Sequence, residues 1–237
     1  MTRVPVLALD TSADIAVTLV GDGEDHPVLA ARRVVGQRRH AELLAPMIAE
    51  VLAEAGVDRR ELGAVVVGTG PAPFTGLRAG LVTARTLAFA LGVPVHGVCS
   101  LDAIAAEAFA TQGQGVHEVV VVTDARRREV YTARYRRRVG GPTTVVEVEQ
   151  VAAPAVLTPL VLAADGALDA ALVVGAGVDL YPEHLTARQD SPRVPDPAVL
   201  TRLAMARVAR GETSGTEPLY LRRPDVTPAA GRKRATG

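Results

Sequence analysis

The 237-residue sequence has one cysteine, no net charge and no apolar run long enough to cross a bilayer. The lone Cys99 excludes an internal disulfide and a zinc site built from several thiolates. Zero net charge excludes an overall attraction to nucleic acid or membrane. A membrane-spanning helix needs about 20 apolar residues, and the first apolar run, residues 4–9, is also too short for a signal-peptide core. We therefore expect a cytosolic protein without a membrane partner.

Several patterns that carry catalysis or metal binding are also missing. The five histidines stand outside any His-x-x-x-His or Cys–His spacing, so they predict no metal centre. Neither Ser12 nor Ser100 has the Gly-x-Ser-x-Gly context of a hydrolase nucleophile. Cys99 stands between an apolar strand and a helix start, and we interpret it as a packing residue. The sequence therefore predicts no catalytic residue.

Strand-like and helix-like patterns alternate along the chain and predict an α/β fold. The expected strands are residues 4–10, 15–20, 28–35, 62–67, 93–98, 118–123, 129–137, 144–151 and 171–174. The expected helices are residues 41–55, with a kink or a late start at Pro46, and 76–91, 101–110, 155–164 and 198–210. The pattern repeats, which indicates two domains, residues 1–112 and 113–224. Residues 225–237 are polar and are expected to be disordered.

A glycine- and proline-rich loop, residues 68–78, resembles a phosphate-binding loop only superficially. A dinucleotide fingerprint needs glycine where Pro73 stands, and a Walker loop needs lysine where Leu77 stands. Pro71 and Pro73 also have no N–H group to offer a phosphate. We interpret the loop as a rigid connection, with Thr75 capping the next helix and Ser100 capping the one after.

Asp10, Thr11 and Ser12 form the expected tip of the first hairpin. In sugar-kinase and actin-like folds such a tip faces nucleotide phosphate, and its acid helps to hold Mg²⁺. Turn preference alone explains the same residues equally well. The matching turn of the second domain, residues 124–128, contains no glycine. We therefore expect at most a vestigial nucleotide site.

Residues 126–138 contain seven arginines and a single acid, Glu129, with Tyr131 and Tyr135 between them. Guanidinium groups could contact RNA phosphates at this segment. All but one of the 26 basic residues are arginine, however, so a solvated strand face in an arginine-rich protein explains the density as well. The candidate tRNA contacts are Arg126, Arg127 and Arg128.

Two helices carry side chains that suggest a partner surface. The helix at residues 76–91 has a stripe of mostly small residues, which would let another helix come close. On the helix at residues 41–55, two apolar side chains fall outside the core stripe and are expected to be exposed. Coverage by the second half of the chain is the alternative. The candidate interface residues are Leu43, Met47, Gly76, Gly80, Thr83 and Leu87.

Six segments, taken together and in order, resemble the TsaB (YeaZ) family over about residues 4–224. They are residues 7–12 (LALDTS), 40–46 (HAELLAP), 70–80 (GPAPFTGLRAG), 94–101 (PVHGVCSL), 124–126 with 129–131 (DAR and EVY), and 218–222 (PLYLR). The resemblance implies two related actin-like ATPase domains, of the ASKHA and ribonuclease H-like class, with a degenerate nucleotide site.

The resemblance also implies a function. TsaB proteins are non-catalytic subunits required for threonylcarbamoyladenosine (t6A) at position 37 of tRNAs that read codons beginning with A. They bind and activate the catalytic subunit TsaD through N-terminal helices, TsaE joins that pair, and homodimers form through much the same surface. ATP and Mg²⁺ then belong to the partner subunits, and tRNA is reached through the complex. The metal-binding histidine motif of TsaD has no counterpart here. A small-molecule kinase or ATPase with Asp10 as metal ligand is the alternative.

Overall fold

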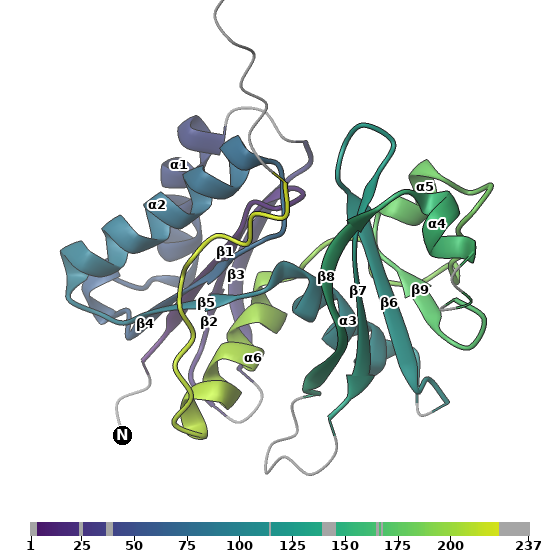
Figure 1. Cartoon of the computed structure of the whole chain (residues 1–237). Coiled ribbons are helices and arrows are strands. Elements are labelled where there is room, and N and C mark those ends of the chain that lie inside the picture. Colours follow the sequence, from purple (N-terminus) through teal and green to yellow (C-terminus); the bar gives the residue numbers. More distant parts are fainter. Residues whose placement is uncertain are drawn as a thin grey trace, which may run out of the picture.

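The computed structural model describes residues 4–23, 26–36, 40–113, 115–138, 146–164, 166 and 168–222. Two β-sheets lie side by side, each with helices packed on it, and helix α3 (Ser100–Thr111) lies between them (Figure 1). The tail expected at residues 225–237 is outside the described residues.

The first sheet has the strand order β3-β2-β1-β4-β5. Strands β1, β2 and β3 form an antiparallel meander, and β4 and β5 add to β1 in parallel. Helices α1 and α2 cover one face. The bounds are β1 Val6–Asp10, β2 Ile15–Val20, β3 Val28–Val34, α1 His40–Ala55, β4 Ala64–Gly68, α2 Phe74–Leu91 and β5 Val95–Val98, with a short 3-10 helix, η1, at Arg59–Glu61.

The second sheet repeats this plan with the order β8-β7-β6-β9. Strands β6, β7 and β8 are an antiparallel meander, and β9 lies parallel to β6. The β6–β7 hairpin therefore corresponds to the β1–β2 hairpin of the first sheet. The bounds are β6 Glu118–Asp124, β7 Val130–Arg137, β8 Val148–Leu157, α4 Pro159–Ala164, β9 Leu172–Val174 and α5 Gly177–Leu180.

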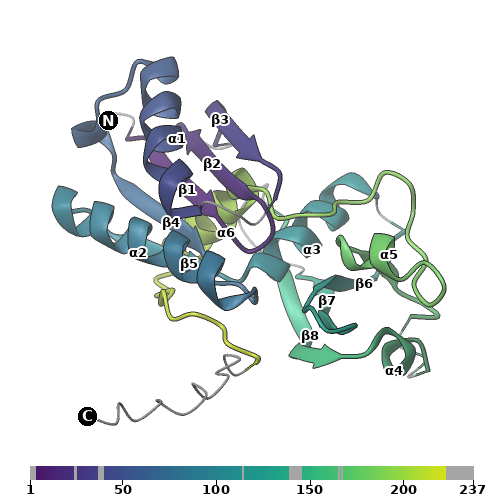
Figure 2. The ribbon, with the colours of Figure 1, turned by 90° about the horizontal axis from the view of Figure 1, so that it is seen from above.

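The chain returns to the first sheet near its end. Helix α6, Pro197–Ala209, falls within residues 113–224, yet it packs on β1, β2, β4 and β5 (Figure 2). Helix α3 packs on the same face through Ala103 and Ala106, and on the second sheet through Leu101 and Ile104. With helices on both faces, β1, β2 and β4 are buried along their whole length, which explains their nearly continuous apolar sequences.

Most predicted elements are confirmed to within a few residues, but one strand and one helix are wrong in extent. The strand expected at residues 144–151 is β8, Val148–Leu157, and residues 144 and 145 lie outside the described residues. Residues 155–157 extend strand β8, and only Pro159–Ala164 is helical. Proline is tolerated in the first turn of a helix but not in its interior, so Pro159 marks a start that the apolar pattern hides. Helix α1 begins at His40 and carries Pro46 inside it.

Candidate functional site

Asp10, at the end of β1, is buried with both carboxylate oxygens bonded within the chain. It is 1% exposed. Its Oδ1 accepts hydrogen bonds from the Ser12 backbone N–H at 2.8 Å and the Ser12 hydroxyl at 2.6 Å. Its Oδ2 accepts a hydrogen bond from the Ser100 hydroxyl at 2.6 Å. This carboxylate therefore joins two segments that lie 90 residues apart in the sequence.

Gly68 and Gly70 allow this joint to form. A Cβ at Gly68 would lie 1.8 Å from Asp10 Oδ2, so only glycine fits beside the carboxylate. Ser100 also accepts from the Gly70 N–H at 3.2 Å and donates its own N–H to the Gly70 carbonyl at 2.8 Å. The expected helix cap at Ser100 is therefore wrong, because Cys99 is the cap residue and the serine hydroxyl serves Asp10.

Burial raises the pKa of Asp10, and the hydrogen bonds from Ser100 and Ser12 and the charge of Arg33 offset part of that rise. Metal binding requires an ionised carboxylate with a free oxygen lone pair facing the ion. Here the oxygens point to neighbours inside the protein, and burial disfavours the charged form. Asp10 is thus better suited to bracing the hairpin than to holding Mg²⁺.

The adjacent Thr11 fixes the start of helix α2. Its hydroxyl donates to the Gly76 carbonyl at 2.9 Å. A Cβ at Gly80 would lie 2.3 Å from Thr11 Oγ1, and a Cβ at Gly76 would lie 3.0 Å from His40 Nε2. The glycine stripe therefore lets α2 pack on the chain's own first hairpin, and Gly76 and Gly80 are not available to another protein. Thr75 caps nothing, since α2 begins at Phe74 after Pro73.

His40, the first residue of α1, is 6% exposed, and its Nε2 has no hydrogen-bond partner within the described part of the chain. Burial lowers its pKa. The ring lies against Gly76 at the start of α2, close to the Thr11 carbonyl of the first hairpin. We interpret His40 as a neutral packing residue.

The exposure expected for the partner surface is only partly found. Met47 is 4% exposed and lies in the core with Leu44 and Val51, so its predicted exposure is wrong. Helical spacing from Leu44 could have indicated this. Leu43 and Leu87 are half-buried against the same core.

Thr83 is also half-buried, and the exposed apolar residues of α2 are two that the sequence reading missed. Val82 is 62% exposed and Phe89 is 90% exposed. They stand seven positions apart on the side of α2 opposite its buried stripe. Their helical positions, on the side opposite the buried stripe, could have indicated this exposure from the sequence.

The β6–β7 hairpin ends in a tight turn, residues 125–129, which we call the arginine turn. Arg126, Arg127 and Arg128 are all exposed and all left-handed, with φ of 63°, 54° and 61°. This conformation costs residues other than glycine about 1–2 kcal/mol each. Asp124 accepts from the Arg126 N–H at 2.7 Å and pairs with its guanidinium at 3.0 Å. The three candidate tRNA contacts thus share one strained tip.

A cleft of about 370 Å³ lies between the two hairpins. Ser12 lines this cleft, whereas Asp10 is buried and is not among the lining residues. Three carboxylates in its wall, Asp14, Asp124 and Asp179, are paired with arginines at 3.6, 3.0 and 2.9 Å. The lining residues are Ser12, Ala13, Asp14, Val35, Gly36, Thr123, Asp124, Ala176, Asp179, Leu180 and Val194. Because each of these carboxylates is paired with an arginine, the charges in the wall are largely balanced and do not exclude an anionic ligand such as a triphosphate.

After α6 the chain forms a strap, residues 214–222, that runs along the first domain. Ser214 O accepts from the Gly97 N–H at 3.3 Å, and the Leu219 N–H donates to Thr69 O at 2.9 Å. Tyr220 stacks on Phe74 at 4.9 Å between ring centroids. The strap therefore pairs with the edge at β5 and covers the start of α2.

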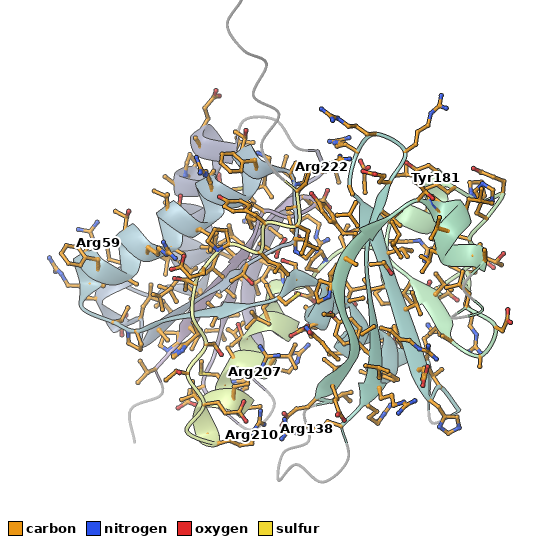
Figure 3. The ribbon with its side chains drawn as sticks, viewed as in Figure 1. Arg59, Arg138, Tyr181, Arg207, Arg210 and Arg222 are labelled. Carbon is orange, nitrogen blue, oxygen red and sulfur yellow. The ribbon has the colours of Figure 1, made fainter. Side chains whose placement is uncertain are left out.

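One arginine of α2 and one of the strap strengthen these contacts. Arg78 lies 3.5 Å over the Phe74 ring and donates to the Tyr220 hydroxyl at 2.9 Å. Arg222 crosses to the second domain, where it donates to Ala125 O at 2.8 Å and pairs with Glu129 (Figure 3). The PLYLR segment of the sequence thus links the loop before α2 to the arginine turn.

A buried polar cluster joins the domains beneath the cleft. Asp102 on α3 accepts from the Tyr135 hydroxyl at 2.9 Å, from Gln150 at 3.0 Å and from Arg207 at 2.7 Å. Burial and the charge of Asp102 raise the pKa of Cys99 far above its usual value. The thiol stays protonated, as expected of a packing residue.

Across the described residues, no three His, Cys, Asp or Glu side chains gather closely enough to hold a metal ion. Within the same part of the chain, no helix combines the length and apolar character that a bilayer crossing requires.

Comparison with known proteins adds three sequence matches. A family model described as TsaD, tRNA N6-adenosine threonylcarbamoyltransferase, matches residues 34–177. An uncharacterized protein of Mycobacterium tuberculosis is 41% identical over 225 residues, which span 95% of both chains. The tRNA threonylcarbamoyladenosine biosynthesis protein TsaB of Escherichia coli is 29% identical over 226 residues, covering 92% of this chain and 94% of the relative.

A solved structure is similar through both domains. YeaZ from Pseudomonas aeruginosa is 34% identical, with a TM-score of 0.74, and the match covers 92% of this chain and 99% of that chain. Together with the repeated strand order, this match confirms the predicted α/β fold of two actin-like domains.

Proposed function

Because the chain belongs to the TsaB (YeaZ) family, we propose that it is a non-catalytic subunit of t6A biosynthesis that binds and activates TsaD together with TsaE. The observation that carries this proposal is the state of Asp10. Its oxygens are bonded to Ser12 and Ser100, so the hairpin that would hold Mg²⁺ in a kinase is tied instead to the start of α3, and the adjacent Thr11 bonds to the start of α2.

The outward face of α2 supports the binding role. Phe89 and Val82 are large apolar side chains in water, at positions that the fold does not need for its own core. Covering them against an apolar partner surface would contribute about 25 cal/mol per Å² buried. We assign this face, with the half-buried Leu43, Thr83 and Leu87 behind it, to TsaD. A homodimer of the isolated chain would use the same face and compete with TsaD.

The remaining parts of the proposal follow from this assignment. ATP and Mg²⁺ are bound by the partner subunits, and this chain requires no cofactor of its own. The chain works in the cytoplasm, where tRNA is modified, and it meets tRNA within the complex.

A binding experiment tests the docking face. Phe89→Asp and Val82→Asp place a charge on the face without touching the core, and we expect each to weaken TsaD binding roughly 100-fold in calorimetry. Leu160→Asp, at a 62% exposed leucine on α4, is the matched control and should bind normally. Normal binding by both α2 variants would contradict the proposed interface. A t6A assay on tRNA with and without this chain tests the activating role.

The cleft between the hairpins favours one rival, a small-molecule kinase or ATPase with Asp10 as metal ligand. Calorimetry of the isolated chain with ATP and Mg²⁺ separates the two. Binding near micromolar with turnover, lost in Asp10→Asn, would establish the enzyme. No heat above dilution is expected.

A further inference from the structure

We infer that the arginine turn, residues 125–129, binds the phosphate backbone of RNA. The inference rests on the proposed function only in naming tRNA as the RNA. It rests on the turn itself for the kind of ligand. Arg126, Arg127 and Arg128 are exposed at the tip of the β6–β7 hairpin, next to Asp124, which lines the cleft.

The backbone of the turn argues for a selected feature. Three successive left-handed residues are strained unless they are glycine, and asparagine or aspartate adopt this conformation more easily than arginine does. An arginine-rich genome raises the arginine content everywhere, but it does not favour arginine in left-handed turns. Residues with a strained backbone are concentrated at binding and active sites. Three such residues, all with a cationic side chain and all at an exposed tip, therefore indicate a binding site.

The turn is also held firmly, which keeps its guanidinium groups in place. The Ala125 N–H donates to Glu129 O at 3.0 Å, and the Glu129 N–H donates to Arg126 O at 3.0 Å. From the strap, Arg222 bonds Ala125 O and pairs with Glu129. A preformed cationic tip binds without a large ordering cost.

The surroundings favour RNA over an acidic protein or a free nucleotide. Four arginines, Arg126 to Arg128 and Arg222, face two carboxylates, Asp124 and Glu129, so the tip carries a positive excess. Tyr181 lies beside the tip (Figure 3), where burial and the charges of Asp124, Glu183 and Glu129 raise the pKa of its hydroxyl and the charge of Arg128 offsets part of that rise. An aromatic ring next to guanidinium groups suits stacked bases and phosphates. None of the three arginines of the turn is among the residues that line the cleft, so the turn is not placed to hold a free nucleotide there.

Fluorescence anisotropy with an unmodified tRNA transcript tests the inference, using the isolated full chain and its complex with TsaD. Arg127→Gln/Arg128→Gln should weaken binding roughly tenfold and lower the slope of log K against log salt by about 2. Arg127→Lys/Arg128→Lys should keep most of the affinity. The matched control is Arg59→Gln/Arg60→Gln, which neutralises two exposed arginines at η1, on the far side of the molecule.

A second variant separates binding from folding. Arg127→Gly/Arg128→Gly relieves the left-handed strain, so it should raise the melting temperature while weakening RNA binding as much as the glutamine pair does. A loss of RNA affinity in a more stable protein cannot be a folding defect.

Two outcomes would overturn the inference. Unchanged affinity and salt slope in the glutamine pair would show that the turn does not contact RNA, and an equal loss in the η1 control would show a general charge effect. TsaD binding without RNA is measured in parallel. If the glutamine pair loses TsaD and keeps RNA, the turn is a protein contact and the inference fails while the proposed function stands. If Phe89→Asp and Val82→Asp keep TsaD, the proposed interface fails while the RNA result still decides this inference.

Discussion

The two hairpins that line the cleft occupy equivalent places in the repeated sheets but differ in burial, charge and backbone conformation. At the β1–β2 tip Asp10 and Thr11 are buried and residues 12–14 are half-buried, and its polar groups bond to loops and helices of its own domain. The β6–β7 tip is exposed, and its three arginines point outward on a strained backbone. In a nucleotide-binding fold both tips would grip the same phosphates.

The first hairpin shows how side chains suited to phosphate chemistry can instead hold helices and loops of their own domain in place. Asp10, Thr11 and Ser12 kept side chains that could serve phosphate chemistry, but their bonds now position α2 and the loop before it. The second tip instead carries the exposed charge. Under the two proposals made above, one hairpin supports a docking helix and the other offers a binding surface.

The comparison predicts the largest effect for Asp10→Ala. The substitution leaves the buried donors of Ser12 and Ser100 without an acceptor, and we expect a loss of about 3 kcal/mol in the free energy of unfolding, measured by urea titration. Asp124→Ala, at the equivalent place in the second hairpin, should cost about 1 kcal/mol, because its partner Arg126 is exposed.

The opposite ranking would show that Asp10 is a retained ligand group. Binding groups are often held at a cost in stability, so their removal is neutral or stabilising. In that case Mg²⁺ with ATP would raise the melting temperature of the wild type and not of Asp10→Ala.

A smaller effect is expected for Gly80→Ala, which tests the packing of α2 on the first hairpin. The new methyl group meets Thr11 Oγ1 at 2.3 Å, so the helix must shift, at a cost of about 1–3 kcal/mol. Thr11→Ala removes the obstructing atoms at the expense of its bond to Gly76 O. In a double-mutant cycle by urea unfolding, the two changes together should cost less than their sum. Strict additivity would mean that α2 does not rest on Thr11.

The sequence was sufficient for the parts of this comparison that depend on local pattern. Alternating and helical periods predict the two meanders and the helices α1, α2 and α6, because neighbouring residues decide them. The absence of phosphate-loop glycines also predicts a degenerate nucleotide site, and this stays a prediction.

The parts that depend on distant residues were out of reach of such patterns. The Ser100 hydroxyl donates a hydrogen bond to Asp10, 90 positions away in the sequence, and Arg222 of the strap pairs with Glu129, 93 positions away. A glycine stripe shows that something comes close to α2, but it does not tell a partner's helix from the chain's own Thr11. The left-handed backbone of residues 126–128 has no glycine to announce it.

The smallest expected effect is a pH dependence at His40, which lies beside the first hairpin. Burial lowers the pKa of His40, so the folded protein binds this proton less tightly than the unfolded chain does. Folding stability should therefore fall as the pH drops through the unfolded value of about 6.5. Urea titrations between about pH 8 and about pH 5 should show a shallower loss for His40→Gln than for the wild type. His117→Gln, at an exposed histidine beside the second sheet, is the matched control substitution. Parallel curves for His40→Gln and the wild type would mean that the ring is solvated, and that α1 and α2 pack less closely around the first hairpin than the structure shows.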